Sequence, residues 1–111
     1  AFLADRLRQA MVKCEKNHKL LAVAYLDLDG FKFINDIHGH EIGDELLITI
    51  SKRMSDVIHG DDILARIGGD EFMVVLTGLE NLDDCVHVLE RLLKASSTIF
   101  SSFFSKSIKQ Q

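Results

Sequence analysis

Apolar residues recur every three or four positions in three segments of this chain, and this spacing predicts three amphipathic helices. The first helix spans residues 2–16, the longest spans residues 41–58, and the third runs to about Ala95 from a cap at Asn81 or Asp83. The residues expected to face the core are Leu3, Leu7, Met11 and Cys14 in the first helix, Leu46, Leu47, Ile50, Met54, Val57 and Ile58 in the longest, and Val86, Leu89, Leu92 and Leu93 in the third.

Short, continuous apolar runs predict the strands. Residues 20–26 read Leu-Leu-Ala-Val-Ala-Tyr-Leu without polar alternation, which predicts a strand buried on both faces. Residues 63–67 and 72–76 are two further runs joined through a Gly-Gly pair, and this arrangement predicts a β-hairpin. Between the first strand and the longest helix, residues 31–37 favour a short helix that ends at Gly39.

The end of the chain differs in character from the rest. Residues 96–111 hold six serines and three phenylalanines, and they show neither a helical period nor a clear alternation. We therefore expect no helix there, and we divide the chain into a folded part, 1–95, and a divergent or truncated tail, 96–111. The β-prone stretches 98–100 and 103–104 are candidates to pair with residues 20–26; otherwise we expect a second molecule to cover that strand edge.

Length and charge exclude several classes of protein. At 111 residues and a net charge of −4, the chain fits one domain or part of one, and it lacks the basic excess of a general nucleic-acid or membrane-surface binder. No apolar run approaches the ~20 residues of a membrane span. Cys14 and Cys85 lie far apart without metal-ligand spacing, which favours two free thiols. We expect a cytoplasmic location, either as a separate protein or as the cytoplasmic part of a larger, membrane-tethered one.

Acidic residues stand where the apolar runs end. Asp27 follows the first strand, and Asp70 and Glu71 are neighbours in the hairpin turn. Carboxylates this close repel each other unless a cation neutralises them, and the adjacent glycines let another group approach the backbone. The pattern predicts a metal and a phosphate, with an ordinary acidic hairpin turn as the alternative. The Asp27 segment does not match an EF-hand loop, because Gly30 comes two positions too early and no loop-closing Glu follows.

Five motif pieces follow one another in order along residues 23–76. They are Asp27-Leu28-Asp29-Gly30-Phe31-Lys32, Asn35-Asp36, Gly39-His40, Gly43-Asp44 and Arg66-Ile67-Gly68-Gly69-Asp70-Glu71-Phe72. Together these pieces resemble the GGDEF domain of diguanylate cyclases. The wording of the first piece resembles GGDEF domains that sit beside an EAL phosphodiesterase domain. The resemblance covers residues 1–95, whereas residues 96–111 match nothing in the family pattern.

The resemblance implies both a fold and an activity. The fold is α/β (α+β): a ferredoxin-like palm as in nucleotide cyclases, with a central antiparallel sheet and packed helices, here C-terminally incomplete. In that palm, residues 20–26 form a central strand, with the hairpin strand 72–76 on one side and a later strand of the family on the other. The activity is the condensation of two GTP molecules, one on each protomer of a homodimer, into cyclic di-GMP and pyrophosphate. Attached sensor or EAL domains are expected in the parent protein.

The resemblance also implies roles for individual residues. Two Mg²⁺ or Mn²⁺ ions per active site would be held by Asp27, Asp70 and the carbonyl of Leu28, since hard cations prefer oxygen ligands. Glu71, together with Asp70, would be catalytic, as a general base or a helper to the metals. Phosphates would be bound by Gly30, Phe31, Lys32, Gly68 and Gly69, and guanine by Asn35, Asp44 and His40. Asp44 also has a simpler explanation, because an acid in the first turns of a helix suits the helix dipole.

One motif of the family is degenerate here. Family members usually carry Arg-x-x-Asp ahead of the signature as a product-binding inhibitory site, and the matching positions are His59 and Asp62. Because histidine lacks the planar fork of arginine and is mostly neutral at pH 7, we expect weak or absent product inhibition. The alternative function is a catalytically inactive, truncated GTP-binding or dimerisation module that regulates an attached domain. A packing domain without any ligand is a third interpretation.

Overall fold

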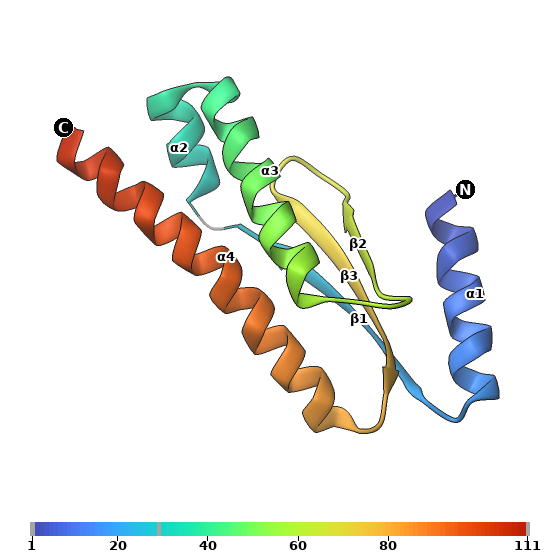
Figure 1. Cartoon of the computed structure of the whole chain (residues 1–111). Coiled ribbons are helices and arrows are strands. Elements are labelled where there is room, and N and C mark those ends of the chain that lie inside the picture. Colours follow the sequence, from blue (N-terminus) through green and yellow to red (C-terminus); the bar gives the residue numbers. More distant parts are fainter. Residues whose placement is uncertain (1, 29, 111) are drawn as a thin grey trace.

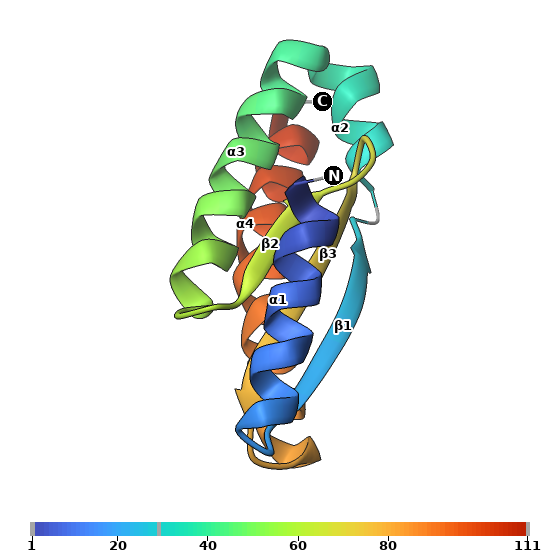
Figure 2. The same cartoon turned by 90° about the vertical axis from the view of Figure 1, so that its right-hand side faces the viewer.

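The chain folds into three layers, described here from a computed structural model for residues 2–28 and 30–110, with side chains up to residue 96 (Figure 1). In chain order the elements are α1 (Phe2–Lys16), β1 (Leu20–Asp27), α2 (Phe31–His38), α3 (His40–Val57), β2 (Ile63–Arg66), β3 (Glu71–Leu79) and α4 (Leu82–Gln110). The strands form an antiparallel sheet in the order β1-β3-β2, with α1 on one face and α3 and α4 on the other (Figure 2). The expected α/β fold is confirmed.

Side-chain alternation along the strands gives the sheet two apolar faces. On the α3/α4 face, Phe72 and Val74 pack against Ile50 of α3, all three almost completely buried. On the α1 face, Met73 and Val75 of β3 pack with Leu7 of α1. Burial of each such side chain contributes about 1.5–3 kcal/mol relative to exposure. The sheet is therefore held between two apolar layers, of which the α3/α4 layer is the larger.

The predicted helix stripes are correct for α3 and partly wrong for the other two helices. Leu46, Leu47, Ile50 and Met54 of α3 are buried as expected. Met11 of α1 is 55% exposed, and Val86 and Leu93 of α4 are 49% and 54% exposed. Ala10, which is only 6% exposed, takes the place of Met11 on the packed face of α1. These helices carry apolar residues on more than one stripe, so spacing alone did not identify the stripe that meets the sheet.

The hairpin strand is longer than its apolar run predicts, because it continues past a β-bulge. Leu20 pairs with Leu79 and Ala22 pairs with Leu76, so β3 holds one residue more than β1 between these pairs. Gly78 in the bulge has a φ of +65°, a conformation that glycine adopts without steric cost. The extra residue belongs to β3, and β1 stays regular.

The strand of residues 20–26 is present as β1, but the expectation that it is buried on both faces is wrong for the described chain. β1 is an edge strand, and on its α1 face Val23 is 43% and Tyr25 70% exposed. The packing of α1 explains this, because its apolar residues pack mainly with Ile63, Met73 and Val75 of the neighbouring strands and meet β1 near its start, at Leu20 and Leu21.

The expectation that residues 96–111 form no helix is wrong for residues 96–110, while residue 111 lies outside the described residues. The backbone of α4 continues without interruption to Gln110, so this segment does not add a strand to β1 (Figure 1). Serine and phenylalanine have middling helix propensities, which an established helix overrides once it has nucleated. The apolar positions Leu92, Ile99 and Phe103 lie seven and four residues apart in the sequence, a helical spacing that was the available signal.

The beginning of α4 is fixed by side chains at its first turn. The Asp84 N–H donates to Asn81 Oδ1 at 3.0 Å, so Asn81 is the cap that the sequence left open against Asp83. The Glu80 N–H donates in turn to Asp84 Oδ2 at 3.0 Å. In the part of the chain that the structure describes, no helix has both the length and the apolar character needed to cross a membrane.

Candidate functional site

Two carboxylates face each other at the end of the sheet where β1 stops and the β2–β3 hairpin turns, here called the hairpin end. Asp27, the last residue of β1, is directly opposite Glu71, the first residue of β3. The Leu28 N–H donates to the Asp70 carbonyl at 3.1 Å, so Leu28 and Asp70, the next residues along, form a hydrogen-bonded pair. In an antiparallel ladder Asp27 and Glu71 then form a non-hydrogen-bonded pair, in which side chains come closest, with Cα atoms about 4.5 Å apart.

These two acids are exposed and lie on the same face of the sheet. The ion pairs found among the described residues join Asp5 to Arg8, Lys13 to Asp61 and Lys19 to Glu80, and none of them reaches Asp27 or Glu71. Like charges directly opposite each other destabilise a sheet by a few tenths to about 1 kcal/mol. The hairpin end therefore concentrates negative charge at a cost to stability.

The hairpin loop is closed by backbone bonds and braced by an arginine. The N–H groups of Ile67 and Gly68 donate to the Glu71 carbonyl at 3.0 and 3.4 Å. Arg66 Nε donates to the carbonyls of Gly68 and Gly69, both at 3.1 Å. Sequence reasoning did not assign this role to Arg66, whose place directly before the Gly-Gly pair was the signal available.

Neither signature glycine adopts a positive φ, so backbone conformation does not require glycine at these two positions. A Cβ added at Gly68 would lie 3.2 Å from a carboxylate oxygen of Glu71, whereas a Cβ at Gly69 would have nothing within 4 Å. Gly68 thus lets Glu71 fold back over the loop. Gly69 leaves open space above the backbone, in agreement with its predicted position beside a phosphate, which stays a prediction.

The metal assignment stays a prediction as well. Among the described residues, no three His, Cys, Asp or Glu side chains come together in a way that would hold a metal ion. Asp70 is half-buried and adjoins the Asp27 strand through its carbonyl, while Asp29 lies outside the described residues. The carboxylate directly opposite Asp27 is that of Glu71 rather than that of Asp70. A cation here would need backbone, water and phosphate oxygens besides the acids, which suits Mg²⁺.

The segment after β1 turns sharply into α2. Gly30 has a φ of +85°, which favours glycine, and it precedes the first residue of α2. The Phe31 N–H donates to the Leu28 carbonyl at 3.3 Å, so a phosphate at Phe31 would have to share this donor. Lys32 is exposed in the first turn of the helix. The predicted phosphate contacts of Gly30, Phe31 and Lys32 remain predictions with this one qualification.

The predicted guanine residues lie on α2 and α3, which pack against each other. Asn35 Oδ1 is buried and has no hydrogen-bond partner within the described structure. A Cβ added at Gly43 would lie 1.8 Å from that oxygen, so only glycine lets Asn35 occupy its position. His40 and Asp44 are exposed in the first turns of α3, on either side of Gly43 in the sequence. The spacer role of Gly43 was missed from sequence, although a glycine inside a helix was its signal.

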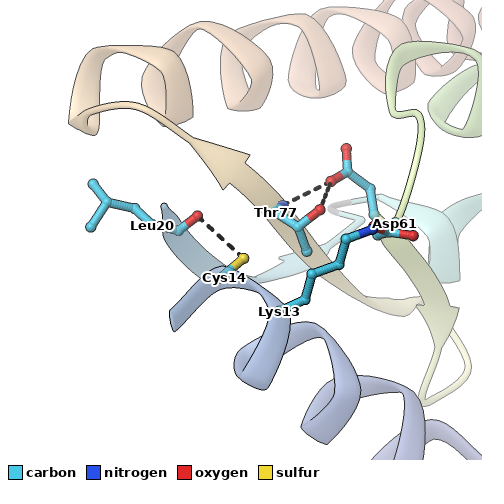
Figure 3. A network of polar contacts seen from close by, with 6 residues as sticks. Lys13, Cys14, Leu20, Asp61 and Thr77 are labelled. Carbon is cyan, nitrogen blue, oxygen red and sulfur yellow. Dashed lines mark hydrogen bonds and ion pairs between the residues drawn. The ribbon is translucent and has the colours of Figure 1, made fainter. Parts of the chain in front are cut away.

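The degenerate inhibitory positions lie at the other end of β2, here called the opposite end of the sheet. His59 and Asp62 form a tight turn in which the Asp62 N–H donates to the His59 carbonyl at 3.1 Å. The Asp62 carboxylate accepts bonds from the Thr77 N–H at 2.8 Å, Thr77 Oγ1 at 3.0 Å and the His59 N–H at 3.3 Å. Figure 3 shows the two bonds made by Thr77. Asp62 is therefore occupied in holding β3 to the turn.

Comparison with known proteins gives the family. The family described as "Diguanylate cyclase, GGDEF domain" matches residues 1–108. The bifunctional diguanylate cyclase/cyclic di-GMP phosphodiesterase MucR of Pseudomonas aeruginosa is 40% identical over 95 residues, which cover 86% of this chain and 14% of MucR. The diguanylate cyclase TpbB of the same species is 37% identical over 93 residues, covering 84% of this chain and 21% of TpbB.

Solved structures agree with these matches. A structure of TpbB that comprises only the GGDEF domain matches with a TM-score of 0.78 and 35% identity, covering 85% of this chain and 55% of that one. The active GGEEF domain of a Vibrio cholerae diguanylate cyclase matches with a TM-score of 0.69 and 34% identity, covering 80% and 56%. The chain thus spans about a fifth or less of these curated relatives and about half of the solved domains. It belongs to the GGDEF domain family of diguanylate cyclases.

Proposed function

We propose that this chain provides the GTP half-site of a diguanylate cyclase, in which two protomers condense two GTP molecules into cyclic di-GMP with release of pyrophosphate. Family membership and the intact signature support the proposal. Each protomer would hold one nucleotide, and the 3′-hydroxyl of one GTP would attack the α-phosphate of the other. GTP as a substrate implies a cytoplasmic site. The relative MucR, named a cyclase and a phosphodiesterase, supports an attached EAL-type domain in the parent protein.

The observation that carries the proposal is the directly opposed pair Asp27 and Glu71. A globular protein gains no stability from two exposed carboxylates at one non-hydrogen-bonded position. A divalent cation would turn this repulsion into attraction, with the Leu28 carbonyl and the Asp70 carboxylate as further oxygen donors. Two Mg²⁺ or Mn²⁺ ions there would neutralise the triphosphate and polarise the phosphorus that is attacked.

The protein's own groups have separate tasks around that point. Glu71 follows the loop that Arg66 holds, and its carboxylate would accept the proton of the attacking 3′-hydroxyl. Gly69 leaves the loop backbone uncovered for phosphate oxygens. A rigid loop suits this chemistry, because phosphoryl transfer depends on positioning and charge stabilisation.

Guanine specificity rests on the α2–α3 junction. Asp44 can accept from the N1–H and N2–H₂ groups of guanine, which adenine does not offer. Asn35 has an unpartnered buried oxygen beside Gly43, and an unsatisfied buried polar group costs about 1–3 kcal/mol. A purine that engages this amide would recover part of that cost. GTP should therefore bind more tightly than ATP.

The test combines turnover with binding on the same preparation. Cyclic di-GMP formation from GTP is measured with Mg²⁺, beside calorimetric titrations with GTP and ATP. We expect GTP binding that requires Mg²⁺ and is reduced by Asp70→Asn, together with product formation. GTP binding without turnover would select the alternative, an inactive module that regulates an attached domain. Equal affinities for GTP and ATP would contradict the assignment of Asn35 and Asp44.

A further inference from the structure

Arg66 binds the hairpin loop through the carbonyl groups of its backbone. The Nε–H of this side chain donates to two carbonyls at once, those of Gly68 and Gly69, both at 3.1 Å. Because these peptide bonds are trans, the N–H of each peptide group points in the direction opposite to its carbonyl. The N–H groups of Gly69 and Asp70 belong to the same two peptide groups as these carbonyls. Both therefore point away from Arg66.

The side of the loop that faces away from Arg66 is the side where β1 ends. Arg66 is the last residue of β2, and the strand order β1-β3-β2 places β1 on the other side of β3. The next carbonyl of the loop, that of Asp70, accepts the Leu28 N–H at 3.1 Å, so this side of the loop faces the residue that follows β1. The two N–H groups are thus turned toward the end of β1, where Asp27 stands.

The Arg66 side chain and the opposed acids lie on different faces of the sheet. Arg66 pairs with Phe72, which packs in the α3/α4 layer, and it lines a hollow together with Lys52 of α3. Glu71 precedes Phe72 in β3, so its side chain lies on the other face, as does that of Asp27 opposite it. Arg66 is therefore placed to act on a nucleotide beside these acids through the loop between them.

The two N–H groups are free to bind a ligand. In the part of the chain that the structure describes, neither the Gly69 N–H nor the Asp70 N–H donates a hydrogen bond, whereas those of Ile67 and Gly68 both donate to the Glu71 carbonyl. A Cβ at Gly69 would meet nothing within 4 Å, so the backbone is open at this point. Backbone N–H groups form charge-assisted hydrogen bonds with phosphate oxygens.

We propose that Arg66 is a positioning residue of the phosphate site. By holding two carbonyls it fixes two peptide groups, so that the N–H groups of Gly69 and Asp70 both donate to phosphate oxygens of a nucleotide bound beside Asp27. Without the Nε donor, the permissive glycine backbone would let these peptide groups rotate, and the two donors would lose their alignment. The inference rests on the proposed function and names the residue that prepares its loop.

Arg66→Lys separates positioning from charge. Lysine has a methylene group in the place of Nε, so the variant keeps the positive charge and loses the donor that the two carbonyls share. The affinity for the α,β-methylene analogue of GTP, measured by calorimetry with Mg²⁺, should fall about 10-fold, because two charge-assisted hydrogen bonds lose their alignment. Lys52→Ala is the matched control, since it removes a cation from the same hollow, and it should change the affinity less than ~2-fold.

Guanosine distinguishes a positioning role from a general loss of structure. It has no phosphate, so Arg66→Lys should leave its affinity, measured by titration of amide NMR signals, unchanged. In spectra of the chain without ligand, the amide signals of Gly69 and Asp70 should shift or broaden in Arg66→Lys. The signal of Val74, in the middle of β3, should stay in place.

Three results would overturn this inference and leave the proposed function standing. They are an unchanged affinity of Arg66→Lys for the analogue, an equal loss of affinity for the analogue and for guanosine, and unaltered amide signals of Gly69 and Asp70 in that variant. An unmodified chain that binds neither GTP nor the analogue would instead refute the proposed function, and this inference with it.

Discussion

The two ends of the sheet use the same kind of side chain for different purposes. At the opposite end, the carboxylates have internal partners: Asp61 binds Lys13 at 2.5 Å, Glu80 binds Lys19, and Asp62 accepts three hydrogen bonds. At the hairpin end, Asp27 and Glu71 oppose each other, and none of the ion pairs in the described chain includes them. One set of acids ties elements together, and the other opposes the strand pairing on which it stands.

This difference separates acids that stabilise the fold from acids that have no such role, which are the ones we propose for a cation. Asp62 connects the turn after α3 to Thr77 of β3, two segments fifteen residues apart, and so closes the hairpin at its base. The side chains of Asp27 and Glu71 take part in none of the ion pairs found among the described residues. An acid pair that costs stability, at two strand ends beside an arginine-braced loop, is the pattern expected of a preorganised cation site.

The largest expected effect comes from neutralising the pair without changing its shape. Asp27→Asn should lower Mg²⁺-dependent GTP affinity or turnover about 100-fold, corresponding to about 3 kcal/mol, because it removes charge from the cation site. The free energy of unfolding should stay unchanged or rise by a few tenths of a kcal/mol, since a like-charge repulsion disappears. Urea unfolding and calorimetry on the same samples measure both quantities. A large loss of stability with intact GTP binding would show that Asp27 stabilises the fold and does not serve a ligand.

The same kind of change at the opposite end should act on stability instead. Asp62→Ala removes three hydrogen bonds and leaves the half-buried Thr77 N–H without its acceptor, which should cost about 2 kcal/mol of unfolding free energy. Glu90→Ala, at an exposed position of α4, is the control and should change stability little. GTP affinity of the folded Asp62 variant should be unaltered. If Asp62→Ala unfolds at the same urea concentration as the unmodified chain, the hydrogen bonds of Asp62 contribute nothing to stability in solution.

Two glycines, Gly43 on α3 and Gly69 in the hairpin loop, allow a finer distinction, between space for packing and space for a ligand. Gly43→Ala would force Asn35 away, because the new Cβ would lie 1.8 Å from Oδ1. We expect a loss of about 1–2 kcal/mol in stability together with a weaker preference for GTP over ATP. Gly69→Ala meets nothing within 4 Å, so its stability should stay within about 0.5 kcal/mol while GTP affinity falls. Unchanged GTP affinity in Gly69→Ala would exclude a ligand at that backbone.

An element could be predicted from the sequence wherever its apolar residues fit only one kind of secondary structure and only one buried face. The apolar stripe of α3 and the run of β1 left one choice of element, and their bounds were correct to within about two residues. Met11, Val86 and Leu93 were misplaced because their helices carry apolar residues on several sides, and only the packed sheet decides between them. The C-terminal part of α4 was missed because its composition masked a spacing that continues from the preceding helix.

For the candidate site, the residues themselves could be predicted from the sequence, but the contacts between them could not. The acids and glycines were identifiable as residues, but their pairing depends on strand register, which places Glu71 rather than Asp70 opposite Asp27. The contact between Gly43 and Asn35 joins two helices, and the bracing of the loop by Arg66 depends on the direction of two carbonyls. Such relations arise only once the elements are packed.

The smallest expected effect concerns the ion pair between Lys13 and Asp61 at the opposite end. The hydrogen bond with Asp61, and then the attraction of its charge, raise the pKa of Lys13 above the ordinary value of 10.5. A raised pKa in the folded state means that the pair stabilises the protein fully below about pH 10.5 and loses that contribution as the pH rises through the folded pKa. The Lys13 side chain is 63% exposed to solvent, so the contribution should be small and should shrink further in high salt. Urea unfolding of Lys13→Gln and the unmodified chain should differ slightly at pH 8 and converge toward pH 11.5, whereas Lys16→Gln, on the same helix, should show no such convergence. A difference that persists unchanged above pH 11 would mean that Lys13 acts through the packing of its aliphatic stem on α1 rather than through its charge.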